Sequence, residues 1–204
     1  MKNNDNILSN FDEYTKIFLK ENAIHNLISK NDEKFLYEKH IYDSLSIKLF
    51  FEKYDYEPKN LLDIGCGGGF PCVPIAIEYP KLKITGIDSI HKKINSVLNI
   101  KNSLKLDNLE LLCDRVENLK TKNFDVIVSR AVANLAKISE YALPLVKKNG
   151  YFIAYKSKKT EEEINEAKSI LKKYNAEIID IIEYTLPLEE IYERKLICIK
   201  KLSD

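Results

Sequence analysis

A chain of 204 residues, of which 45% are hydrophobic, is long enough for one domain with a sizeable core and too short for two comfortable ones. Its 32 basic and 31 acidic side chains nearly balance, so nucleic acid would have to bind a local basic patch rather than a global positive field. The longest apolar runs fall far below the roughly 20 residues that cross a bilayer, which predicts a soluble protein without membrane partners.

The first sixty residues predict amphipathic helices. Apolar residues recur there at three- and four-residue spacing, as on the buried face of a helix. The two runs are Ile7, Phe11, Tyr14 and Phe18, followed by Leu36, Ile41, Leu45 and Leu49. The pattern changes near Pro58, so we expect a helical extension over residues 1–57, packed on a core over residues 58–204.

After Pro58, short β-rich runs alternate with helical ones. The runs are LLDI (61–64), KITGID (83–88), LELLC (109–113), FDVIVS (124–129) and YFIAY (151–155). Each is separated from the next by enough residues for a crossover connection. Near-continuous apolar strands joined by helices are typical of a parallel sheet that is covered on both faces, so the sequence predicts an α/β fold.

Four of the six glycines lie in the segment 65–69, directly after the first predicted strand. Gly65, Gly67 and Gly69 form the predicted strand-to-helix turn, and Pro71 falls near the first turn of the helix that follows. Ligands of open parallel sheets bind beyond the carboxyl ends of the strands, where such a turn brings backbone amides close to the ligand. An ordinary tight turn is the alternative interpretation.

The glycines do not fit the dinucleotide fingerprint G-x-G-x-x-G, which would require glycine in place of Phe70 or Cys72. The pattern D-x-G-x-G-x-G over residues 63–69 instead resembles the first motif of class I S-adenosylmethionine-dependent methyltransferases. Asp88 ends the next strand, where an acidic residue can hold ribose hydroxyls. Its alternative role is the N-cap of a helix that begins near His91, and both roles can coexist.

Longer segments carry a more specific resemblance. They are HNLIS (25–29), HIYDSL (40–45), IGCGGGFPCVPIAIEYP (64–80), IDSIHKKINSVLNI (87–100), DRVENL (114–119), FDVIVSRAVANL (124–135) and GYFIAYKS (150–157). Together they resemble the glucose-inhibited division protein B family, also called RsmG, and the SRA triplet at 129–131 is the most telling. The resemblance implies a Rossmann-like seven-stranded sheet with the last strand antiparallel, and transfer of a methyl group from S-adenosylmethionine to N7 of a guanosine in 16S ribosomal RNA.

The resemblance also assigns site residues. It places cofactor contacts on Gly65 and Phe70, on Val116 and Glu117 after the third strand, and on Arg130; Gly67 and Asp88 complete the predicted set. Val116 would contact the adenine ring plane and Glu117 its polar end, although a solvated charge is the alternative for Glu117. Arg130 would bind a cofactor carboxylate or an RNA phosphate, or else be a buried ion-pair partner. Cys72 departs from the glycine that the family usually has there.

No acid–base residue is required by this chemistry, because guanine N7 already carries a free lone pair and catalysis can consist of positioning. Lys156 ends the fifth strand and is the residue that we expect to contact RNA phosphate. Lys92, Lys93, Lys158 and Lys159 extend a basic rim that could equally be a solvated face. His25 and His40 are assigned to packing or capping.

The remaining expectations concern metals, location and other functions. Cys66, Cys72, Cys113 and Cys198 form no C-x-x-C pair and no zinc spacing. Together with the absence of a visible signal peptide, they predict free thiols filling small sites, no bound metal, and a cytoplasmic protein, which we expect to be a monomer. The sequence leaves open a methyltransferase for another RNA or a small molecule, a cofactor-binding RNA-assembly module without transfer activity, and a nicotinamide dehydrogenase.

Overall fold

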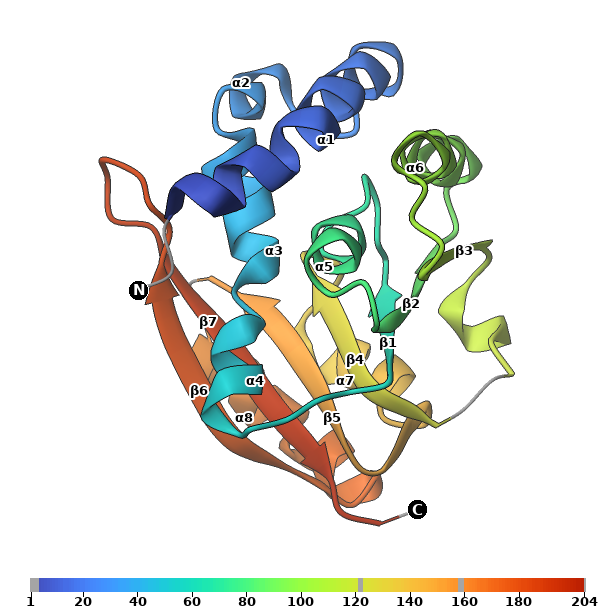
Figure 1. The fold of residues 1–204 in the computed structure, drawn as a ribbon. Helices are drawn as coiled ribbons and strands as arrows, with labels where there is room; N and C mark the ends of the chain where they lie inside the picture. Colours follow the sequence, from blue (N-terminus) through green and yellow to red (C-terminus); the bar gives the residue numbers. More distant parts are fainter. Residues whose placement is uncertain (1–3, 121–122, 158–159, 204) are drawn as a thin grey trace.

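One seven-stranded sheet runs through the described part of the chain in the computed structural model (Figure 1). The structure describes residues 4–120, 123–157 and 160–203, with side chains from Phe11 onward. The strands are β1 (Asn60–Ile64), β2 (Lys83–Asp88), β3 (Leu109–Cys113), β4 (Phe124–Arg130), β5 (Val146–Lys156), β6 (Ala176–Thr185) and β7 (Glu193–Lys201). Their order is β3-β2-β1-β4-β5-β7-β6, and β7 alone among these runs in the opposite direction to the others. The predicted parallel strands and antiparallel last strand are confirmed.

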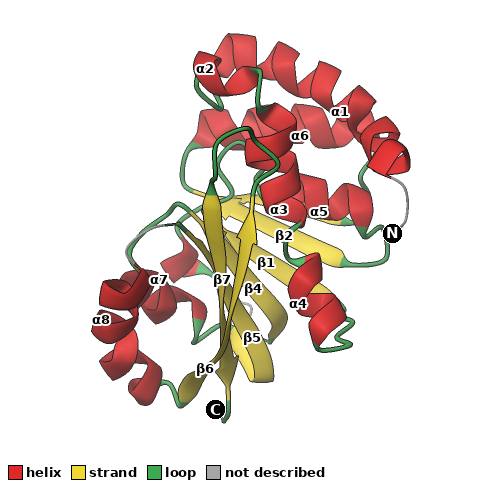
Figure 2. Ribbon diagram, turned by 90° about the vertical axis from the view of Figure 1, so that its left-hand side faces the viewer, coloured by secondary structure: helices red, strands yellow, loops and turns green. Residues whose placement is uncertain are grey.

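Helices cover both faces of the sheet (Figure 2). Before β1 they are α1 (Asn4–His25), α2 (Lys30–Glu33), the π-helix η1 (Leu36–Tyr42), α3 (Asp43–Leu45) and α4 (Lys48–Lys53). After β1 they are α5 (Cys72–Glu78), α6 (His91–Leu104), the 3₁₀ helix η2 (Val116–Asn118), α7 (Leu135–Ala142) and α8 (Thr160–Lys173). Helices α7 and α8 lie on one face, and α1, α5 and α6 lie on the other.

Burial of both sheet faces explains the apolar strands of the sequence. Along β4, Val126 and Val128 belong to the core on the α5 and α6 side, whereas Ile127 between them belongs to the core on the α7 and α8 side. Because successive side chains of a strand point to opposite faces, a strand covered on both sides reads as an unbroken apolar run.

The N-terminal helices pack directly on the glycine turn. Phe11, Tyr14 and Phe18 of α1 are buried as their spacing predicts, and the Phe18 ring centroid lies 5.1 Å from that of Phe70. The side chain of Ile7 lies outside the described ones. One apolar cluster therefore joins the N-terminal helices to the turn after β1.

The strand order indicates where a ligand site is expected. The chain runs outward from β1 to β3 on one side and returns to β4 on the other, so the order reverses between β1 and β4. Such a switch point is where open α/β sheets bind ligands, beyond the carboxyl ends of the strands. The glycine turn follows β1 there, and Arg130 ends β4.

Candidate functional site

The glycine turn has the backbone conformation that its composition predicts. Gly65, Gly67 and Gly69 have φ values of +73°, +54° and +91°. A Cβ atom at Gly65 would collide with Cγ2 of Val132, in the loop after β4. Because L side chains rarely adopt positive φ and the space above Gly65 is already filled, the turn requires glycine at this position.

A cavity of about 620 Å³ opens above this turn, and we call it the first cavity. All seven predicted cofactor residues line it: Gly65, Gly67, Phe70, Asp88, Val116, Glu117 and Arg130. They come from the turn after β1, the end of β2, the 3₁₀ helix after β3 and the end of β4. The sheet therefore gathers at one edge residues that are up to 65 positions apart, and each residue's contact with a cofactor stays a prediction.

Asp88 uses both carboxylate oxygens to shape this edge. Its Oδ2 accepts a hydrogen bond from the Gly67 amide at 2.9 Å, and its Oδ1 accepts one from the Ile90 amide at 2.8 Å. The N-cap position of α6 is Ile90, so Asp88 holds the turn before the helix rather than capping it as the alternative interpretation supposed. Each carboxylate oxygen has a second lone pair, which remains suited to a ribose hydroxyl.

Val116 and Glu117 stand on the short 3₁₀ helix η2, with Val116 half-buried and Glu117 exposed. Asp114 fixes the start of this turn, because its Oδ1 accepts hydrogen bonds from the Arg115 amide at 2.7 Å and from Asn118 Nδ2 at 2.8 Å. The contact with Asn118 is the main cause that lowers the pKa of Asp114. An apolar side chain and a carboxylate are thus presented side by side at the cavity wall.

A hydrogen bond between Asp63 and Cys72 connects β1 to the start of α5 beneath the turn. Asp63 Oδ2 accepts a hydrogen bond from the Cys72 amide at 3.0 Å. Burial raises the pKa of Asp63 to about 7, and its Oδ1 has no partner among the described residues. The Cys72 side chain packs in the core toward Gly86, and Cys72 is not among the residues that line the first cavity. The departure from the family's glycine therefore places a thiol in the core and not in the ligand space.

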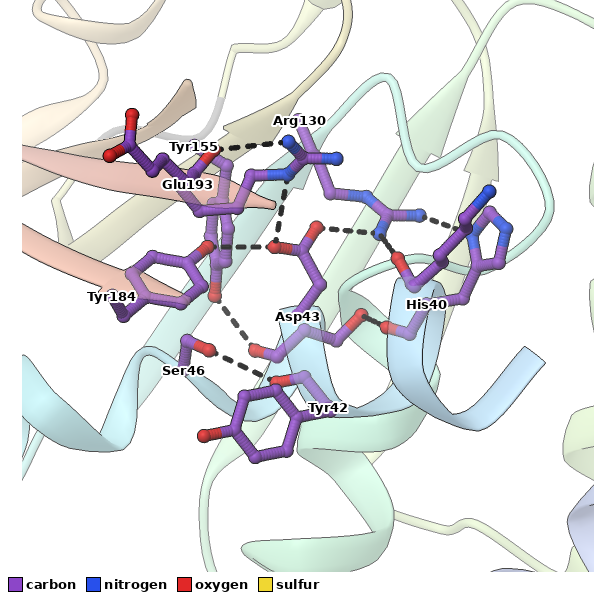
Figure 3. Close-up of polar contacts among 11 residues, drawn as sticks. His40, Tyr42, Asp43, Ser46, Arg130, Tyr155, Tyr184 and Glu193 are labelled. Carbon is purple, nitrogen blue, oxygen red and sulfur yellow. Dashed lines mark hydrogen bonds and ion pairs between the residues drawn. The ribbon is translucent and has the colours of Figure 1, made fainter. Parts of the chain in front are cut away.

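Arg130 meets three polar groups of the N-terminal segment (Figure 3). Its Nη1 lies 3.0 Å from Asp43 Oδ2 and donates to the Lys39 carbonyl at 3.3 Å, while its Nη2 lies 3.1 Å from His40 Nδ1. The guanidinium carbon is 5.1 Å from the centroid of Phe70, within cation–π range. Arg130 is thus an ion-pair partner, as the alternative interpretation expected, and it also lines the first cavity, while its contact with a cofactor or with RNA stays a prediction.

His40 is a neutral imidazole in this arrangement. A guanidinium only donates hydrogen bonds, so His40 Nδ1 accepts and the ring proton lies on Nε2. Burial, and after it the neighbouring Arg130 charge, lower the pKa of His40 to about 4. Its Nε2 has no partner among the residues described. Sequence reasoning gave His40 no chemistry and did not single out Asp43, although both lie in the motif HIYDSL that carried the family resemblance.

Lys156 lies at a second cavity of about 610 Å³ and does not line the first. Its ammonium is 2.6 Å from Glu163 Oε2 and donates to the Ala133 carbonyl at 2.7 Å. Of the proposed basic rim, Lys93 lines the first cavity and Lys92 is exposed, while Lys158 and Lys159 lie outside the described residues. The structure thus separates Lys156 from most of the cofactor set, with Arg130 common to both cavities.

All four cysteines are free thiols as predicted; Cys66, Cys72 and Cys198 are buried, but Cys113 is exposed and fills no core site. Within residues 4–120, 123–157 and 160–203, no group of three or more His, Cys, Asp or Glu side chains could hold a metal ion. Across the same ranges, no helix combines the length and apolarity that a membrane span requires.

Comparison with known proteins identifies the family of the chain. The chain matches the family model GidB, described as rRNA small subunit methyltransferase G, over residues 7–191. The ribosomal RNA small subunit methyltransferase G of Staphylococcus saprophyticus is 38% identical over 197 residues, covering 95% of this chain and 81% of the relative. The protein of the same name from Lactobacillus helveticus is 38% identical over 199 residues, covering 95% and 82%.

Solved structures resemble the chain in fold. TYW2 of M. jannaschii, solved in complex with AdoMet, superposes with a TM-score of 0.61 at 15% identity, covering 78% of this chain and 76% of that one. A SAM-dependent O-methyltransferase from Thermotoga maritima gives a TM-score of 0.59 at 15% identity, covering 80% and 66%. These likenesses confirm the predicted Rossmann-like methyltransferase fold.

Proposed function

Because this chain belongs to the GidB family of rRNA small subunit methyltransferases, we propose that it transfers a methyl group from S-adenosylmethionine to N7 of a guanosine in 16S ribosomal RNA. The observation that carries the proposal is the convergence of the seven predicted cofactor residues on the first cavity, at the switch point between β1 and β4. Ligand sites of α/β sheets lie at this point, so the sequence motifs and the topology select the same place.

The residues present suit S-adenosylmethionine. Gly65 and Gly67 carry no side chain and line the first cavity, so backbone atoms of the turn border the space for a ligand. Asp88 supplies a carboxylate for the ribose hydroxyls, and Glu117 supplies one for the polar edge of adenine, beside the apolar Val116. Arg130 already donates to three groups of the N-terminal segment, and the N–H donors of its planar guanidinium that remain would fit the carboxylate of the methionine end. Phe70 adds an apolar side chain to the lining of the cavity.

Methyl transfer to guanine N7 requires the chain to position the two reactants. Bound S-adenosylmethionine supplies a methyl group on a positively charged sulfur, and guanine N7 supplies the lone pair that attacks it. The chain's part is to hold the two in line at short range, which can lower a barrier substantially without proton transfer. Neutral His40, with its pKa lowered to about 4, adds no positive charge to the lining of the first cavity at neutral pH.

The RNA side of the proposal rests on the second cavity. Lys156 lines it, and residues 130–132 form a wall that it shares with the first cavity. A nucleotide that enters the second cavity therefore approaches the cofactor across this wall. We place the Lys156 contact with RNA phosphate here.

The proposal extends to organisation and location. We assign residues 1–57 to a helical extension packed on a methyltransferase core of residues 58–204, since Phe11, Tyr14 and Phe18 share one apolar cluster with the glycine turn. We also propose that the protein acts as a monomer in the cytoplasm, where its ribosomal RNA substrate would be found.

A methyl-transfer assay tests the function directly. Small ribosomal subunits from cells that lack this protein are incubated with the chain and labelled S-adenosylmethionine, and the modified nucleotide is mapped by mass spectrometry. We expect N7-methylguanosine at one position of 16S RNA. Modification of another RNA or base would select a different substrate, and cofactor binding without transfer would select an RNA-assembly module. Binding of a dinucleotide in place of S-adenosylmethionine would select a dehydrogenase.

A further inference from the structure

The second cavity carries almost balanced charge. Four basic and three acidic side chains line it: Lys39, Arg130, Lys156 and Arg194, with Asp32, Asp43 and Glu163. Each basic group lies near an acidic one, since Lys39 Nζ is 3.0 Å from Asp32 Oδ1 and Arg194 Nε is 3.8 Å from Asp43 Oδ1, in addition to the pairs described above. Attraction for phosphate is therefore partly cancelled here, and RNA recognition needs a further feature.

Tyr192 supplies an aromatic face at this cavity. It lies in the connection between β6 and β7, residues 186–192, which stands at the end of the sheet next to the N-terminal helices (Figure 2). Its carbonyl accepts a hydrogen bond from the Leu186 amide at 3.0 Å, and Leu186 is buried, so the connection is anchored on both sides of the hairpin. Tyr192 is half-buried, unlike Tyr155, a second tyrosine that lines this cavity, which is buried and donates to the Ser44 carbonyl at 2.8 Å.

Lys39 links Tyr192 to Arg130 and so to the wall between the cavities. Its ammonium lies 5.5 Å from the centroid of the Tyr192 ring, and its carbonyl accepts the hydrogen bond from Arg130. The Lys39 cation thus lies over the Tyr192 ring, and Tyr192 itself is part of the lining of the second cavity. An aromatic ring of this kind is the feature on which proteins stack unpaired RNA bases.

We propose that Tyr192 is a stacking platform for a base of the unpaired RNA segment that carries the target guanosine, which enters the second cavity. The inference rests on the proposed function and deepens it, because it names the class of substrate that the cavity takes as single-stranded RNA. Stacking is insensitive to phosphate charge, so it supplies recognition where the paired cations supply little. Arg194, two residues further on, flanks the platform with a donor for the RNA backbone.

Two measurements on Tyr192→Ala test the platform. The first is kcat/KM for methyl transfer to unmethylated small subunits, and the second is Kd for a fluorescein-labelled single-stranded RNA of about twelve nucleotides that contains guanosine. Loss of one base–aromatic stack predicts a decrease of roughly 10- to 100-fold in kcat/KM and a weaker Kd of the same order. Tyr192→Phe retains the ring and should stay within about twofold of the wild type in both.

The controls separate stacking from stability and from cofactor binding. Tyr54→Ala removes a surface aromatic ring that lines neither cavity and should leave both measurements unchanged. Affinity for S-adenosylmethionine should also be unchanged in Tyr192→Ala, because Tyr192 does not line the first cavity. Should Tyr192→Ala fail to fold, Tyr192→Leu, which keeps apolar bulk without an aromatic face, should show the same loss.

Three results would overturn the inference: wild-type RNA affinity in the folded alanine or leucine variant, an equal loss in Tyr192→Phe, or a parallel loss of cofactor affinity. Absence of methyl transfer by the wild-type chain would instead contradict the proposed function. The RNA-binding measurement would still decide the role of Tyr192 in that case, so the two failures are distinguishable.

Discussion

Arg130 at the end of β4 and Asp43 at the start of α3 form an ion pair, with 3.0 Å between Nη1 and Oδ2 (Figure 3). Asp43 is almost fully buried, and its other oxygen accepts a hydrogen bond from the Tyr184 hydroxyl at 2.7 Å. One carboxylate thus joins the N-terminal helices, β4 and β6. Separation of a buried ion pair is unfavourable because it leaves an uncompensated charge. The pair therefore holds the Arg130 guanidinium in place where the two cavities meet.

Arg130→Lys should weaken S-adenosylmethionine binding roughly tenfold. Lysine keeps the charge but loses the planar fork that reaches Asp43, the Lys39 carbonyl and His40 together. Calorimetric titration with the cofactor measures the effect, and a melting curve shows whether the variant is folded. Normal cofactor affinity with weakened RNA binding would move Arg130 from the cofactor site to the RNA surface.

Asp88→Ala should reduce the cofactor binding free energy by about 1.5 to 3 kcal/mol, the usual contribution of a hydrogen bond to a charged group. The variant also releases the amides of Gly67 and Ile90, so its thermal stability should be measured beside its affinity. A lower melting temperature with unchanged affinity would show that Asp88 only shapes the turn.

Lys156→Ala should leave S-adenosylmethionine affinity unchanged, weaken RNA binding, and lower the salt dependence of RNA binding by roughly one counterion. Titration with RNA at several salt concentrations gives this slope. Glu163→Gln is the matched variant, because it removes the charge that lies 2.6 Å from the Lys156 ammonium while keeping an acceptor for the Leu135 amide. It should strengthen RNA binding, and weaker binding in both variants would argue against a phosphate contact.

Asp63→Asn should change how stability depends on pH. Burial raises the Asp63 pKa from 3.8 to about 7, so its contribution to stability is fully present below about pH 4 and is lost as pH rises through 7. The unfolding free energy of the variant, relative to the wild type, should therefore increase by roughly 4 kcal/mol between pH 4 and pH 8. Urea unfolding across this range measures it.

The pH dependence that His40 gives to stability has the opposite sign to that of Asp63. Its pKa is lowered to about 4, so its contribution is present above about pH 6.5 and is lost as pH falls toward 4. The wild type and Asp63→Asn share this contribution of His40, so it cancels when their unfolding free energies are subtracted. A difference that does not vary with pH would contradict the raised pKa of Asp63.

The sequence by itself determined the parallel strands and the edge of the sheet at which the predicted cofactor residues lie. Strands β1 and β4 begin and end within one residue of the apolar runs 61–64 and 124–129, because burial on both faces leaves a continuous local signal. The glycine turn was equally predictable, since glycine is the residue that adopts a positive φ, such as that of Gly65, without steric cost. Once the strands are parallel, residues at their carboxyl ends must meet at one edge, which is why the predicted cofactor residues share a cavity.

Only the tertiary structure decided the partners of these residues. The pairing of Arg130 with Asp43 joins residues 87 positions apart, and the two lie together only because the N-terminal helices pack over the end of β4. Tyr192 reaches the second cavity through the connection between β6 and β7. Strand β6 is only half-buried and gave no continuous apolar run to mark it, although β7 carries the buried run 196–199. Contacts of this kind depend on how distant elements pack, and no local pattern of the chain specifies which side chain stands opposite another.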